Sequence, residues 1–109
     1  MTYRYGKFSG NQIASAKERM RKQIFFLLLI VDPNTAEEYD DIDIPEAIEN
    51  VLYVFGGLND LLYEPPEMVK VMSLLNAAYL EYQSDHFNWQ KYRKLILDAG
   101  NAVLSIKEV

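Results

Sequence analysis

Apolar residues recur every three or four positions along most of the chain, which is the spacing of one face of an α-helix. The first helix is predicted to begin near Ser9 or Asn11 and to end at about Val31. Every position from 24 to 31 is apolar, so this half must be covered on several sides. A buried strand is the alternative for this run, but its three consecutive leucines and the helical period before it favour a helix. The inward face carries Ile13, Met20, Ile24, Leu27, Leu28 and Val31.

The second helix is predicted from a capping signal at residues 43–46. Asp43 is a suitable N-cap, and Glu46 stands three residues later, where it can complete a capping box. Gly56 and Gly57 then interrupt the pattern, and they either kink the helix or end it. The predicted inward residues are Ile44, Ile48, Val51, Leu52 and Phe55.

Two more helices complete the pattern. The pair Pro65 and Pro66 is predicted to start the third helix. Asn88 is a suitable N-cap for the fourth, and Phe87 before it can pack on Tyr92 after it as a hydrophobic staple. The third inward face is Met68, Val71, Met72, Leu75, Tyr79 and Tyr82. The fourth is Trp89, Tyr92, Ile96, Ala99, Val103 and Ile106.

Four helices joined by short loops pack most simply as antiparallel neighbours. We therefore predict an all-α, single-domain four-helix bundle over residues 1–109, because this length buries one core but does not divide into two. Residues 1–8 are expected to form an extended N-terminal arm. Residues of about 32–43 are expected to form an acidic loop.

Composition narrows the class of protein. Half of the residues are apolar and none is cysteine, which excludes disulfides and thiolate metal sites. No secretion signal is visible, and the longest apolar run has eight residues, whereas a bilayer crossing needs about 20. We therefore expect a cytoplasmic protein that has no contact with a membrane.

The net charge of −5 is unevenly distributed. Residues 1–23 carry +5, residues 24–70 carry −10, and residues 71–109 are neutral. Such asymmetry can guide partners or subunits together. Alternatively, the two charged segments neutralise each other within the fold.

The acidic stretch holds seven carboxylates in residues 32–46. It lacks three of the defining positions of an EF-hand calcium loop, so a metal site is not expected there. The remaining interpretations are a solvated connection or a docking surface for a basic partner. For docking we favour Glu37, Glu38, Asp40 and Asp41, with Tyr39 as the aromatic centre.

The parts needed for catalysis are missing from the sequence. The single histidine is His86, no serine stands in a nucleophile elbow, and no glycine-rich phosphate loop is present. Helical bundles that hold two metal ions use a Glu-x-x-His motif, which the chain lacks. We therefore expect no enzymatic activity and no cofactor.

Basic and aromatic residues near the N-terminus form the one plausible nucleic-acid footprint. They are Tyr3, Arg4, Tyr5, Lys7, Lys17, Arg19, Arg21 and Lys22. Aromatic rings can stack on bases while cations neutralise phosphate. The negative net charge argues against direct binding, because nucleic-acid-binding domains are usually basic.

Several further aromatics lie outside the predicted inward faces, namely Phe26, Tyr39, Tyr53 and Tyr63. Aromatic residues at a surface commonly anchor protein interfaces. The favoured function is therefore a non-catalytic protein-binding module, with a homodimer as one form of it. An alternative is an inhibitor of the phage or mobile-element type, such as an anti-CRISPR, that blocks a nucleic-acid channel by acidic mimicry. A second alternative is a nucleic-acid binder that uses the basic first helix.

Overall fold

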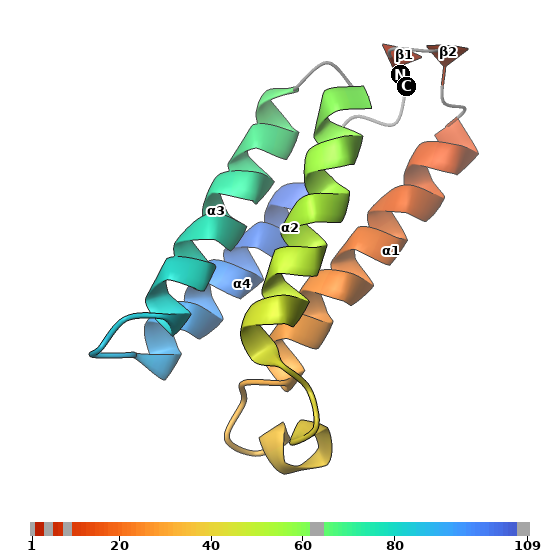
Figure 1. The fold of residues 1–109 in the computed structure, drawn as a ribbon. Coiled ribbons are helices and arrows are strands. Elements are labelled where there is room, and N and C mark those ends of the chain that lie inside the picture. Colours follow the sequence, from red (N-terminus) through yellow and green to blue (C-terminus); the bar gives the residue numbers. More distant parts are fainter. Residues whose placement is uncertain (1, 4–5, 8–9, 62–64, 107–109) are drawn as a thin grey trace.

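The computed structural model describes residues 2–3, 6–7, 10–61 and 65–106. Its α-helices are α1 (Gly10–Leu29), α2 (Ile44–Leu61), α3 (Pro66–Tyr82) and α4 (Trp89–Leu104). Successive helices run in opposite directions along one long axis (Figure 1). This arrangement confirms the predicted all-α four-helix bundle.

Three shorter elements accompany the helices. Strands β1 (Thr2–Tyr3) and β2 (Gly6–Lys7) pair antiparallel, with Thr2 opposite Lys7. Two-residue strands are too short to leave a periodic signal in the sequence. A single 3₁₀ turn, η1 (Ala36–Tyr39), lies in the connection between α1 and α2.

The helix α1 ends two residues before the predicted Val31. The backbone amides of Val31 and Asp32 both donate to the carbonyl of Leu28, at 3.2 and 2.9 Å. The Val31 amide therefore does not make the α-helical hydrogen bond to Leu27, and the helix ends. The Thr35 hydroxyl then donates to the Leu29 carbonyl at 2.6 Å. One of the carbonyls that a helix end leaves without a partner is thereby satisfied.

The helix α2 begins as predicted and continues through its two glycines. The Asp43 carboxylate accepts a hydrogen bond from the Glu46 amide at 3.1 Å, which confirms Asp43 as a capping residue. A Cβ at Gly57 would meet no atom within 4 Å, and one at Gly56 would lie 3.8 Å from Met72 Cε. Neither glycine is needed for close packing, although each costs about 1 kcal/mol in a helix relative to alanine.

The start of α4 also confirms its predicted signals. The Asn88 side chain accepts a hydrogen bond from the Lys91 amide at 3.1 Å. The rings of Phe87 and Tyr92 lie 5.9 Å apart, as expected for a hydrophobic staple.

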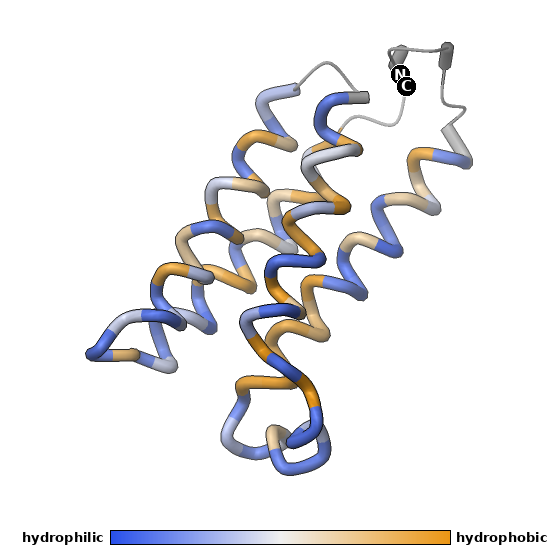
Figure 2. Tube along the Cα trace, in the orientation of Figure 1, coloured by the Kyte–Doolittle hydropathy of each residue, from blue (hydrophilic) through white to orange (hydrophobic). Residues whose placement is uncertain are grey.

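The core lies on the inward faces of the four helices, where Figure 2 shows many of the hydrophobic positions. Buried side chains include Ile13, Met20, Ile24, Leu27, Leu28, Ile48, Phe55, Met68, Val71, Leu75, Tyr92, Ile96, Ala99, Val103 and Ile106. Val31 is half-buried, and its neighbour Ile30 is buried instead, because the turn after Leu29 changes which side chain points inward.

Packing between the helices is uneven. The helix α4 packs extensively on α3 and α1, and α2 packs on α3, whereas α1 and α2 touch only slightly. A groove of about 610 Å³ lies between α1 and α2 at this slight contact. The Tyr79 hydroxyl of α3 donates to the Glu49 carboxylate of α2 and links the two helices at their surface.

Candidate functional site

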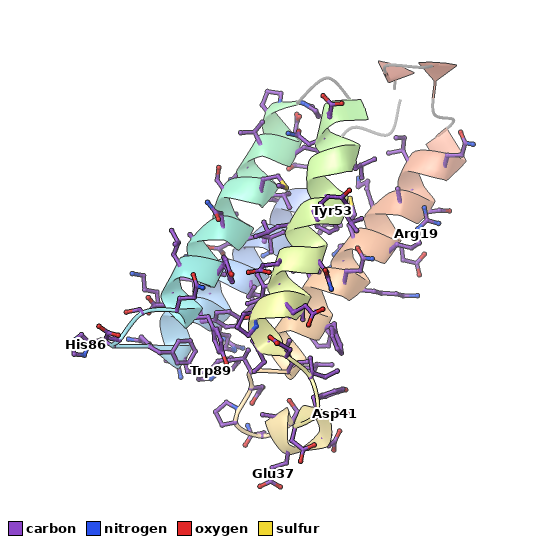
Figure 3. All side chains as sticks on the ribbon, in the orientation of Figure 1. Arg19, Glu37, Asp41, Tyr53, His86 and Trp89 are labelled. Carbon is purple, nitrogen blue, oxygen red and sulfur yellow. The ribbon has the colours of Figure 1, made fainter. Side chains whose placement is uncertain are left out.

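Four exposed carboxylates lie together at one end of the bundle, on η1 and the turn after it. We call Glu37, Glu38, Asp40 and Asp41 the acidic tip. The connection between α1 and α2 forms this end, and Figure 3 places Glu37 at its extremity with Asp41 nearby. The structure therefore brings these four predicted site residues together.

Backbone hydrogen bonds fix the shape of the segment that carries the acidic tip. The amides of Thr35 and Ala36 donate to the Asp32 carbonyl at 3.0 and 2.8 Å. Farther along, the Ile42 amide donates to the Tyr39 carbonyl at 3.0 Å. The acidic tip is thus a folded turn rather than an open loop.

Tyr39, the predicted aromatic centre of the surface, attaches the tip to the bundle. Its ring meets that of Phe26 edge to face, with the centroids 5.6 Å apart and the planes at 89°. Tyr39 is half-buried, whereas the four carboxylates around it are exposed. Its packing on α1 therefore accounts for this aromatic residue, and the exposed chemistry of the tip is purely acidic.

No base neutralises the acidic tip within the described part of the chain. The ion pairs found there are Lys22–Glu18, Lys91–Glu81 and Lys94–Asp98, none of which includes a tip residue. None of the described bases of α1 therefore forms an ion pair with a tip residue. Four like charges repel each other in this state, and a cationic partner would relieve that repulsion.

The basic residues Lys17 and Lys22 of α1 make different contacts. Lys17 Nζ donates to the carbonyls of Leu104 and Ile106 at 3.1 and 2.8 Å, which satisfies the end of α4. Lys22 Nζ lies 3.3 Å from the Glu18 carboxylate, one turn away on the same helix.

Arg19 and Arg21 point to different sides of α1. Two residues rotate a helix by about 200°, so the pair cannot share one face. Arg19 borders the groove between α1 and α2, whereas Arg21 borders a groove between α1 and α4. Tyr3 and Lys7 belong to β1 and β2, and Arg4 and Tyr5 lie outside the described residues. Of the described bases of α1, Lys17, Arg21 and Lys22 therefore line one groove, whereas Arg19 lies on the other side of the helix.

Exposed apolar side chains mark a second surface, which sequence reasoning did not locate. A groove of about 660 Å³ runs between α1 and α4, and Phe25, Leu29, Leu97 and Leu104 are among its lining residues. We call it the α1–α4 groove. Leu97 and Leu104 depart from the predicted inward face of their helix, which is the signal that could have indicated the groove. Of the other surplus aromatics, Tyr53 is 86% exposed and Tyr63 lies outside the described residues.

The described residues offer no assembled catalytic or metal site. His86 is exposed in the connection between α3 and α4, where its backbone amide donates to Ser84 Oγ at 3.1 Å. Within the described ranges, no three side chains among His, Cys, Asp and Glu converge so that they could hold a metal ion. No helix there combines the length and apolarity that crossing a bilayer requires.

The fold and these surfaces define a small helical bundle that presents a cluster of acids at one end and an apolar groove along one side. Comparisons with protein-family models, curated proteins and solved structures found no match to this chain. Its function must therefore be inferred from the chemistry of its own surfaces.

Proposed function

We propose that the protein is a non-catalytic binding module that engages a basic surface of a protein partner through the acidic tip. The observation that carries this proposal is a folded turn with four exposed carboxylates and no described ion pair. A solvated connection would need no such fixed arrangement. Here Tyr39 and Phe26 hold the turn against α1, so the backbone that carries the four carboxylates is fixed on the bundle.

The physical basis of recognition is mainly electrostatic. The four carboxylates lie within five consecutive residues, 37–41. Neighbouring positions in this segment are closer together than the Debye length, which is about 8 Å at physiological salt. The carboxylates therefore act on an approaching cation as one charged patch. Patches of this kind raise association rates and select the sign of the partner more than they add affinity.

Charge reversal at the tip tests the proposal. Asp40→Lys together with Asp41→Lys replaces two attractive charges with two repulsive ones, and neither side chain makes a described ion pair that the fold would lose. Exposed pairs are each worth about 0.2–1 kcal/mol, so the double reversal should weaken partner binding at low salt by about tenfold or more. The matched control is Asp85→Lys, an exposed acid in the α3–α4 connection.

The experiment uses wild-type, tip-reversed and control proteins as bait, identifies a shared partner, and then measures its affinity against salt. We expect wild type and the Asp85→Lys control to bind equally, with an affinity that falls as salt rises. The tip-reversed protein should bind weakly and show a flatter salt dependence. Equal affinity of all three proteins at low salt would mean that the tip is merely solvated.

A second candidate function is inhibition of a nucleic-acid-binding protein by phosphate mimicry. The supporting observation is the position of the carboxylates at the end of an elongated molecule of 42 × 24 × 20 Å, a shape suited to entering a channel. Carboxylates spaced along a turn could then occupy positions that phosphates take. Competition between this protein and a DNA oligonucleotide for the captured partner, lost in the tip-reversed variant, distinguishes this function from simple adaptor binding.

A further inference from the structure

The α1–α4 groove is an apolar trough with the length of a short helix. Its lining residues on α1 extend from Ala14 to Leu29, which corresponds to about 22 Å or four helical turns. Buried Ile24 and Ile96 form part of its floor. Two parallel ridges with an apolar floor between them are the geometry into which an amphipathic helix docks.

The groove exposes large apolar side chains that the bundle does not cover. Phe25 and Leu104 are each 53% exposed, and Leu97 beside them is half-buried. Phe25 and Leu104 lie outside the core of the bundle, whereas the half-buried Leu97 packs against its edge. Contiguous exposed apolar residues of this kind characterise interaction surfaces.

Gly100 lowers the floor of the groove without being required by helix packing. A Cβ built there would lie 4.0 Å from Ile24 Cγ2, which is ordinary van der Waals contact. Alanine would therefore fit between α1 and α4 and would favour the helix. The glycine instead leaves room above the α1–α4 contact, within the lining of the groove.

The charges at the border of the groove determine the sign of its occupant. Lys17, Arg21 and Lys22 line it, against the single acid Glu18, whose carboxylate pairs with Lys22. Arg21 is exposed and forms no ion pair among the described residues. An arginine beside an apolar floor is suited to a carboxylate that arrives with apolar neighbours.

The acidic tip of a second copy supplies the charge but not the apolar anchors, and its α2, which exposes Tyr53 and Val54, is already packed on α3. The tip carries exposed carboxylates, but Tyr39, the aromatic residue among them, packs on its own α1. We therefore propose that the α1–α4 groove docks an amphipathic helix of a different protein, with leucine-type anchors on one face and acidic residues beside them. This partner is opposite in charge to the one that the acidic tip would engage.

Peptide binding tests the proposal. The probe is a synthetic peptide of about 16 residues, or four turns, with leucines at helical spacing and flanking glutamates. A second peptide has lysine in place of each glutamate. Two-dimensional NMR of isotope-labelled protein should show saturable shifts confined to residues 14–29 of α1 and 96–104 of α4 for the acidic peptide, and binding at least about tenfold weaker for the basic peptide.

Two pairs of variants separate a specific site from general stickiness. Arg21→Glu should weaken binding of the acidic peptide by about tenfold, whereas Arg19→Glu, on the other side of α1, should change it less than twofold. Gly100→Ala should weaken binding a few-fold, while Gly57→Ala should not, although both should stabilise the fold. Because both alanine variants are expected to fold, a loss of binding at position 100 alone cannot be ascribed to unfolding.

Several outcomes would overturn the proposal. They are the absence of saturable binding up to millimolar peptide, equal effects of the two arginine variants, and shifts that map to the groove between α1 and α2. Light scattering provides a further check on the occupant. A dimer that Phe25→Glu converts to a monomer would identify a second copy as the occupant and refute docking of a different protein.

Discussion

The buried hydroxyl of Tyr92 gives the sharpest test of how this bundle is held together. It belongs to α4 and donates to the backbone carbonyl of Leu27 at 2.8 Å. Leu27 lies in the last turn of α1, where carbonyls lack partners within the helix. The amide four residues on, that of Val31, donates to Leu28 instead. Tyr92 therefore satisfies from another helix a carbonyl that α1 leaves open.

Replacing Tyr92 with phenylalanine removes this donor and little else. The aromatic ring remains to pack on Trp89 and Phe87, whose centroids lie 6.0 and 5.9 Å from it. The Leu27 carbonyl, in contrast, is left buried without its partner, which costs about 1–3 kcal/mol. For a domain of about 100 residues, each kcal/mol corresponds to a melting temperature lower by roughly 4–8 °C.

Urea and thermal unfolding, followed by circular dichroism, measure the effect. The matched control is Tyr53→Phe, because Tyr53 is 86% exposed and makes no described hydrogen bond, so its loss should change the free energy of unfolding by less than about 0.5 kcal/mol. Equal stability of the two variants would refute the reasoning, since it would mean that the Leu27 carbonyl does not depend on Tyr92.

Three further predictions concern the same helix, α4. Burial raises the pKa of Tyr92 above its ordinary value of 10.0, with a smaller contribution from Tyr82, so the folded protein keeps a proton that the unfolded chain loses. The contribution of this pKa difference to the free energy of unfolding is complete below about pH 10 and is lost as pH rises, by up to about 1.4 kcal/mol per pH unit. Denaturant titrations at alkaline pH should therefore show wild type losing stability more steeply than Tyr92→Phe. Asn88→Ala removes the cap on the Lys91 amide and should cost about 0.5–2 kcal/mol in urea unfolding, whereas retained stability would show that the cap is dispensable. Lys17→Met should cost about 1 kcal/mol and speed hydrogen exchange at the end of α4, and unchanged exchange there would contradict its role in satisfying the last carbonyls.

The helices and their inward faces could be predicted because their signals are local. Asp43 and Asn88 cap their helices through the amide three residues on, so each cap is visible within a few letters of sequence. Helical spacing of apolar residues likewise identifies most of the core. The end of α1 was harder to predict, since the turn after Leu29 depends on competing backbone hydrogen bonds.

The surfaces could be predicted less well, because their character depends on contacts between distant residues. The acidity of the tip is evident in the sequence, but the packing of Tyr39 on Phe26 is a tertiary contact that no local pattern indicates. In the same way, Lys17 looks like a free surface base until α4 brings the Leu104 carbonyl to it. The charges of a segment are therefore readable from sequence, whereas their availability to a partner is not.

The uneven charge of the chain has a consequence that separates its two candidate surfaces. The acidic tip has no exposed aromatic or aliphatic anchor, because Tyr39 is turned onto the bundle. Binding there must rest on exposed charges, and salt screens such contacts. The α1–α4 groove combines Arg21, which forms no ion pair among the described residues, with Phe25 and Leu104. Part of its binding would therefore come from apolar burial, which salt does not weaken. Partners of the tip should therefore dissociate at high salt, while a helix in the groove should be retained, and the salt at which a partner is lost indicates which surface it occupied.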